Sequence, residues 1–86
     1  MAVVGKTVNK IAGVDGVIAI PVGKKIYGFC RMFGFDAYLS QNGIEYRLAN
    51  SALAEFYFHV PMEFAASASI IFRGSGAGTP SVLMDE

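Results

Sequence analysis

The sequence predicts a mainly β protein, either a small antiparallel sheet or an SH3-like, bent β-barrel of about five or six strands with one or two short helical turns. Three observations support this fold class. Turn-forming residues recur about every 8–12 positions, the runs between them are rich in β-branched and aromatic residues, and Asn42-Gly43 is the dipeptide that two-residue hairpin turns prefer. We expect one β-rich domain that covers residues 1–86.

The first two strands are expected on either side of a lysine-containing turn. Residues 1–15 carry scattered valines without a clean period and predict no defined element. The continuous apolar run at residues 17–21 predicts a strand that is buried on both faces. Residues 22–25 then form the turn, and residues 26–33 form the second strand.

Simple alternation along residues 26–33 predicts two faces of different character. One face carries Ile26, Gly28, Cys30 and Met32, and the other carries Tyr27, Phe29, Arg31 and Phe33. The second face has more aromatic area than a small monomer should leave in water, so we expect it to be an interface.

The strongest local signal is the hairpin around Asn42-Gly43. A type I′ turn there pairs Gln41 with Ile44, Leu39 with Tyr46 and Ala37 with Leu48. These pairs place apolar side chains on one face and leave Ser40, Glu45 and Arg47 on the other. We therefore expect the hairpin to be half-buried.

The last third of the sequence is less regular. Residues 50–55 predict a short helix or loop, and residues 56–60 predict a strand that Pro61 closes. Residues 62–68 are ambiguous and are interpreted as a short helix or turn, followed by a strand over residues 67–72. Residues 74–81 read as a glycine-rich loop that leads to a short apolar tail at residues 82–84.

The composition contains more apolar material than one small core can readily hide. Of the 86 residues, 53% are hydrophobic, with seven Phe and four Tyr, whereas a domain of this size buries only about 60–65% of its unfolded surface. We therefore expect a homo-oligomer in which part of the apolar surface is covered by another subunit.

Charge and cysteine content argue against several classes of partner and location. Seven basic residues balance seven acidic ones, and no block of like charge is longer than Lys24-Lys25, so we expect no nucleic-acid partner. The single Cys30 excludes an internal disulfide, and together with the single His59 it predicts no metal site and a reducing, cytoplasmic location. We also expect no membrane segment, because the longest uncharged run, residues 74–84, is short and glycine-rich.

Possible catalytic signals have simpler structural explanations. The segment VVGKT at residues 3–7 resembles the end of a phosphate-binding loop but lacks the required upstream glycine. GSGAGT at residues 74–79 has threonine where a dinucleotide fingerprint has glycine or alanine, and no βαβ unit surrounds it. Glu55, His59 and Glu63 are spaced by four, which on a strand spreads them over roughly 26 Å. We therefore expect no catalytic residues and no cofactor-binding residues.

The segment DGVIAIPVGKKIYGFCRMFG resembles the opening of the Imm26-type family of bacterial immunity proteins. The positions that match the family pattern are Ala19, Ile20, Pro21, Tyr27, Gly28, Arg31 and Gly34. Cys30 stands where a glycine is usual, and the similarity covers about a third of the chain. The resemblance implies a small β-rich protein that neutralises a toxin by binding it.

Two functional hypotheses follow. The first is a non-catalytic protein-binding domain, in the form of an immunity-like protein from a mobile gene set that binds a toxin or other protein partner. The second is a small oligomeric ligand-binding or enzymatic domain with a pocket around Tyr57 and His59. The candidate interface residues are Tyr27, Phe29, Arg31, Phe33, Tyr57 and His59.

Overall fold

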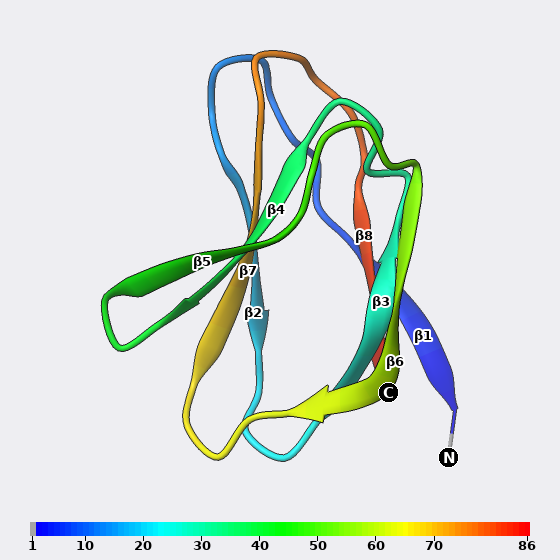
Figure 1. Cartoon of the computed structure of the whole chain (residues 1–86), viewed down its shortest axis with the longest axis vertical. Coiled ribbons are helices and arrows are strands. Elements are labelled where there is room, and N and C mark those ends of the chain that lie inside the picture. Colours follow the sequence, from blue (N-terminus) through cyan, green and yellow to red (C-terminus); the bar gives the residue numbers. More distant parts are fainter. Residues whose placement is uncertain (1) are drawn as a thin grey trace.

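The computed structural model describes residues 2–86, which form eight β-strands in two antiparallel sheets of four (Figure 1). One sheet has the order β1-β8-β3-β6 and the other has the order β2-β7-β4-β5. The strands are β1 (Val3–Thr7), β2 (Gly16–Ile20), β3 (Lys25–Cys30), β4 (Asp36–Gln41), β5 (Ile44–Ala49), β6 (Glu55–Glu63), β7 (Ala68–Arg73) and β8 (Ser81–Asp85). The expectation of a mainly β, antiparallel protein is confirmed.

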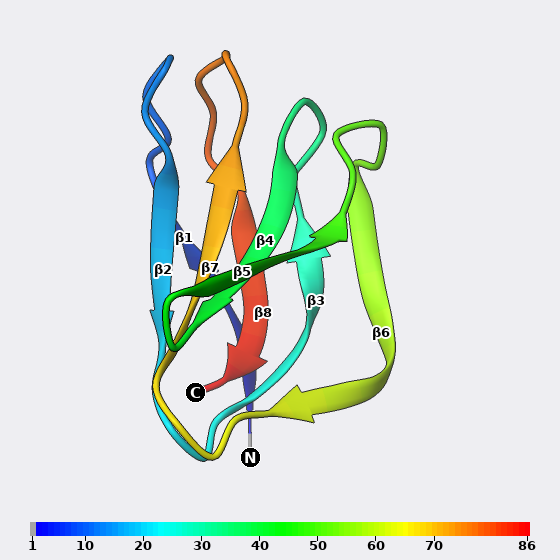
Figure 2. The same cartoon turned by 60° about the vertical axis from the view of Figure 1, so that its left-hand side comes forward.

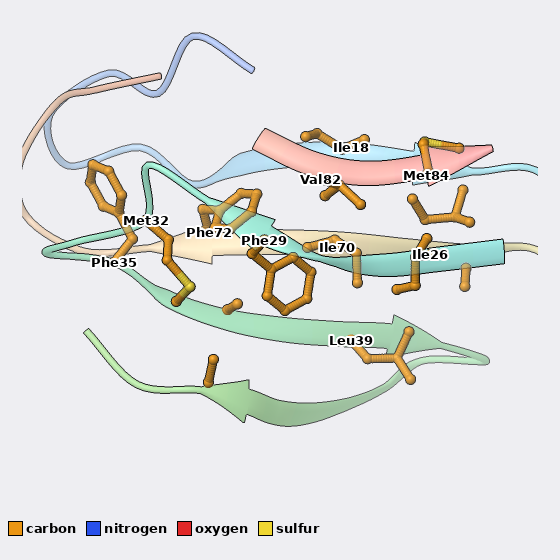
Figure 3. Packing of buried hydrophobic residues seen from close by; sticks show 14 of the residues in the cluster. Ile18, Ile26, Phe29, Met32, Phe35, Leu39, Ile70, Phe72, Val82 and Met84 are labelled. Carbon is orange, nitrogen blue, oxygen red and sulfur yellow. The ribbon is translucent and has the colours of Figure 1, made fainter. Parts of the chain in front are cut away.

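The two sheets form two layers, and the core lies between them (Figures 1 and 3). Ile26, Phe29 and Val82 of the first sheet are fully buried, as are Ile70 and Phe72 of the second. The expected barrel is wrong, because the ladders end at the edge strands β1 and β6 of one sheet and β2 and β5 of the other. The expected count of five or six strands is also too low, since β1 and β8 lie in segments without a clear strand pattern.

Strand β2 is buried on one face only. Ile18 and Ile20 point into the core, whereas Val17 is exposed. The expectation of a strand buried on both faces is therefore wrong. A run of small and β-branched residues satisfies the β geometry equally well when alternate side chains lie on the solvent face of an edge strand.

A β-bulge at Tyr27 changes which residues of β3 face the core. Ile26 pairs with Met84 of β8 and Gly28 pairs with the adjacent Leu83, so Tyr27 is the extra residue. An extra residue reverses the alternation beyond it, and Phe29 consequently joins Ile26 inside. The expected common face of Tyr27, Phe29, Arg31 and Phe33 is wrong for this reason, and β3 itself ends at Cys30.

The hairpin of β4 and β5 forms as expected. Asn42 and Gly43 have φ values of 55° and 76°, and both signs fit a type I′ turn. The pairs Gln41 with Ile44 and Leu39 with Tyr46 are present, but a register shift after Ala37 pairs it with Ala49 instead of Leu48.

Half-burial holds for β4 but not for most of β5. The hairpin projects away from the two layers (Figures 1 and 2), so Ile44 and Tyr46 remain 52% and 56% exposed. Arg73 of β7 supports the projecting strand, because its guanidinium donates hydrogen bonds to Glu45 on β5 and to Asp15 in the loop before β2, each at 3.0 Å. Both carboxylates hold the pKa of this guanidinium above its usual value.

The expected helical turns are absent from residues 2–86. Residues 50–54 form a turn between β5 and β6, and residues 64–67 form a loop before β7. Strand β6 continues through Pro61 to Glu63, since a proline is compatible with an edge strand whose N–H groups on one side need no partner. The strand expected over residues 67–72 is β7.

Strand β8 lies in the middle of a sheet. It pairs with β1 on one side and with β3 on the other, and its Val82 and Met84 point into the core. The expectation of a terminal tail over residues 82–84 is therefore wrong. The C-terminal segment is therefore one of the two central strands of the first sheet.

Candidate binding surface

Strand β6 forms one edge of the first sheet and carries two of the candidate residues. Its inward-facing Phe56 and Phe58 are partly buried and pack against the core. Its outward-facing Tyr57 and His59 are exposed, with Tyr57 at 58%. The strand therefore presents aromatic side chains on both faces next to an edge that no strand of this chain covers among residues 2–86.

An aromatic cluster fixes β6 to the rest of the molecule. The ring centroid of Phe29 lies 6.1 Å from that of Phe56, 5.4 Å from that of Phe58 and 5.7 Å from that of Phe72 in the opposite sheet. The contacts with Phe58 and Phe72 are edge-to-face, a favourable arrangement for aromatic quadrupoles. Phe29 thus positions the exposed strand from inside.

Two neighbours position the Tyr57 side chain. A Cβ on Gly28 would clash with the carbonyl oxygen of Phe56 and lie 3.0 Å from the Tyr57 ring, so only glycine allows β3 and β6 to approach this closely. The Tyr57 hydroxyl donates a hydrogen bond to Glu55 Oε2 at 2.9 Å. This bond to a carboxylate raises the pKa of the Tyr57 hydroxyl.

The six candidate residues do not form one surface. Phe29 is fully buried, so its expected place in an interface is wrong. Arg31, whose φ is 56°, and Phe33, which is 71% exposed, lie in the loop between β3 and β4. That loop bonds to the segment before β6, through Met32 N–H to Ala54 and Gly34 N–H to Ser51.

Tyr27 is half-buried, and its side chain is held by a hydrogen bond within the chain. Its hydroxyl donates a 2.6 Å hydrogen bond to Asp85 Oδ1, and the Lys25 N–H donates to Asp85 Oδ2 at 3.1 Å. The Tyr27 hydroxyl, and to a smaller extent the Lys25 N–H, hold the pKa of the Asp85 carboxyl below its usual value. The same carboxylate raises the pKa of Tyr27. The side chain ties the bulge of β3 to the end of β8.

The edge strands carry further exposed apolar residues that the sequence did not identify as candidates. Val60 of β6 is 70% exposed, and Val3 and Val4 of β1 are exposed on opposite faces of that strand. Ile44 and Tyr46 of β5 were expected inside. Alternation alone cannot show how far the facing sheet extends, and this extent decides whether a core-side residue is covered.

Two shallow pockets on the described part of the chain do not include Tyr57 or His59. One shallow pocket of about 300 Å³ lies at the end of the second sheet, near Pro21, Gln41 and Ser67. Another of similar volume lies beside Leu48, Leu53 and Phe56. Both are open to solvent, and neither is lined by Tyr57 or His59.

Glu55, His59 and Glu63 all lie on β6, which extends at both ends beyond the strand expected over residues 56–60. Within the part of the chain that the structure describes, no group of three or more His, Cys, Asp or Glu side chains is placed to hold a metal ion. Residues 2–86 also include no helix of the length and hydrophobicity that would cross a membrane.

Comparison of the chain with models of protein families, with curated proteins and with solved structures finds no match.

Proposed function

We propose that this chain is a non-catalytic protein-binding domain that associates, first of all, with other copies of itself. One observation carries the proposal: among residues 2–86, every large hydrophobic residue that is exposed within a strand lies in an edge strand. These residues are Val3 and Val4 in β1, Val17 in β2, Ile44 and Tyr46 in β5, and Tyr57 and Val60 in β6.

Edge strands with apolar side chains favour association for a physical reason. Their outer N–H and C=O groups can pair with another strand, and burial of the side chains beside them adds hydrophobic stabilisation. The central strands differ, since Tyr38 and Leu83 on them are half-buried and Ile71 is buried. The apolar surface is therefore concentrated where a new strand could be added.

Sedimentation velocity at micromolar concentration tests this proposal. We expect a mass that is a multiple of 9.2 kDa and that decreases on dilution. Tyr57→Glu places a charge on an edge strand and should shift the population towards the monomer, whereas Asn50→Asp in the exposed turn before β6 should not. A constant mass of one chain at all concentrations would overturn the proposal.

The toxin-neutralising role implied by the N-terminal resemblance is a narrower form of the same proposal. In that case a toxin would occupy an edge in place of a second copy. Co-purification with a toxin encoded beside this gene would support that role. No contact in the structure favours it over self-association, so the sedimentation experiment comes first.

A further inference from the structure

Strand β1 is an arm with little support from its own chain. All five of its residues, Val3–Thr7, are exposed, so neither face of the strand is covered. Among residues 2–86 it pairs only with β8, and Figure 1 shows it on the side of the molecule away from β2 and β7. A strand that is exposed on both faces and along one edge has room for a partner on three sides.

Gly5 at the centre of β1 is not required by the fold of a single copy. Its φ lies outside the left-handed region, and a Cβ built there would meet only Leu83, at an ordinary distance of 3.8 Å. Glycine weakens a strand interior, and where its own fold does not require it, it often marks the close approach of another backbone or ligand. The residue therefore points to a neighbour outside the chain.

We propose that β1 of one copy pairs with the free edge of β6 in a second copy, so that the first sheet continues from subunit to subunit. This inference rests on the proposed self-association and names the edges that meet. The strand directions are compatible with it. Each ladder in the order β1-β8-β3-β6 is antiparallel, so β1 and β6 run in opposite directions. Copies that are repeated around an axis parallel to the strands bring them together as an antiparallel pair.

The existing ladders also suggest the register. Within one copy, Lys6 is in the same row as Phe56, through Val82 and Phe29. Gly5 is likewise in the row of Tyr57, and Thr7 is in the row of Glu55. Rotation without translation keeps these rows and places each β1 residue opposite the β6 residue of its row in the next copy.

This register brings complementary side chains together on both faces. On the core side, the Lys6 stem would lie against Phe56, and Val4 would face Met62, the β6 residue of its row; the single copy leaves both of these β6 side chains partly exposed. On the outer side, Gly5 would bring no side chain against the exposed Tyr57. The Thr7 hydroxyl, which lies 2.7 Å from the Ser81 hydroxyl, could accept from Ser81 and donate to Glu55.

The arrangement of β6 against a second β6 is less favourable. An antiparallel pair centred on His59 would place Glu55 directly opposite Glu63, and like charges across a ladder are destabilising. Pairing of β1 with a second β1 would close a two-fold dimer. Pairing of β1 with β6 leaves one copy with a free β6 edge and the other with a free β1 edge, so further copies can add to form rings or longer chains. The two arrangements are therefore distinguishable by cross-linking.

Disulfide cross-linking tests the proposed pair in a Cys30→Ala background. Thr7→Cys combined with Glu55→Cys should give a ladder of multimers on a non-reducing denaturing gel after mild oxidation. The two cysteines of one chain cannot join, since three strand spacings separate them by about 14 Å and a disulfide spans less than about 7 Å between Cα atoms. Thr7→Cys with Glu63→Cys is the matched control, with the same strands in a wrong register, and should remain uncross-linked.

Mixtures of single variants determine which edges meet. Thr7→Cys mixed with Glu55→Cys should give dimers only, and Thr7→Cys alone should give none. Dimers from Thr7→Cys alone would show β1 against β1 and overturn the inference. So would equal cross-linking in the wrong-register control. Absence of cross-links at concentrations where sedimentation shows oligomers would also overturn it, while leaving the proposed self-association intact.

A charge placed at Gly5 gives a second measurement that needs no cross-link. Gly5→Glu would lie diagonally across from Glu55 and should weaken association by up to about fivefold, because like charges across a ladder repel. Gly5→Lys is the matched control: it also adds a long side chain beside Tyr57 but places the opposite charge near Glu55, so it should weaken association less than Gly5→Glu does. Circular dichroism checks that both variants fold. Equal weakening by both charges would count against the register.

Discussion

At the scale of single residues, Phe29 is the side chain on which most aromatic packing depends. Its ring contacts Phe56, Phe58 and Phe72, and it is fully buried. We expect Phe29→Ala to lower the free energy of unfolding by about 3–5 kcal/mol. Phe33→Ala, at a side chain that is 71% exposed, should change it by less than about 0.5 kcal/mol. Urea denaturation measures both, and similar losses for the two variants would contradict this assignment of core and surface.

The hydrogen bond between Tyr27 and Asp85 makes stability dependent on pH. The pKa of Asp85 is lower in the folded chain than its usual value, so the folded state binds fewer protons than the unfolded one in acid. This contribution is present above the ordinary carboxyl pKa of about 4 and is lost as the pH falls through the lower, folded value. Tyr27→Phe removes the main cause of the shift.

We expect Tyr27→Phe to raise the midpoint pH of acid unfolding and to leave a weaker dependence of stability on pH below about 4. Tyr38→Phe is a suitable control, because the Tyr38 hydroxyl makes no hydrogen bond to a side chain among residues 2–86. Acid titrations followed by circular dichroism measure the midpoints. An unchanged midpoint for Tyr27→Phe would show that the Asp85 carboxylate is stabilised by other groups.

The identity of inward-facing residues could be predicted only where alternation is unbroken. In β4, Ala37 and Leu39 were expected on the apolar face, and both are buried. In β3 the same reasoning placed Phe29 on the wrong side, because one extra residue at Tyr27 reverses the faces. Tyr27 fits either face by size and polarity, so the local sequence contains no signal for the bulge.

At the scale of single elements, the β4–β5 hairpin was predictable because its turn is local. A type I′ turn requires positive φ at both central residues, and Asn-Gly supplies them at low cost. The lengths and neighbours of the remaining strands depend on residues far away in sequence. Residues 50–54 and 64–67 have helix-compatible compositions, yet they only connect strands whose positions the sheets determine.

Replacement of Gly43 by valine tests the turn. The φ of Gly43 is 76° and nothing lies within 4 Å of a Cβ built there, so the change introduces backbone strain without a clash. We expect Gly43→Val to reduce stability by about 1–2 kcal/mol. Gly76→Val is the matched control, since that loop glycine also has free space but lacks a positive φ. Equal melting temperatures for the two variants would contradict the turn assignment.

At the scale of the whole molecule, the β class was predictable and the architecture was not. Strong turn signals and β-rich runs are sufficient to predict a mainly β protein. A sandwich with β8 between β1 and β3 requires pairing of the two ends of the chain, such as Val4 with Met84. Neither end has a sequence pattern that indicates which strand it pairs with. The candidate binding surface could not be predicted for the same reason, because edge strands can be identified only when the strand order is known.

Deletion of the two ends should therefore have unequal effects, although the sequence gives both a similar weak pattern. Removal of residues 81–86 takes away a central strand together with Val82 and Met84, which line the core, and it also leaves β1 without a partner. We expect this variant to lose cooperative thermal unfolding, because the lost core surface and the lost ladders on both sides of β8 exceed the small free energy of unfolding of a small domain.

Removal of residues 2–7 takes away only exposed side chains and one ladder, and Lys10 stays bonded to Gly78 through both backbone groups. That variant should still melt cooperatively, with somewhat lower stability, and should sediment as a single chain, because the arm that joins the copies is missing. Differential scanning calorimetry and sedimentation velocity measure these outcomes. A cooperative transition without residues 81–86 would contradict the central place of β8, and oligomers without residues 2–7 would show that another edge joins the subunits.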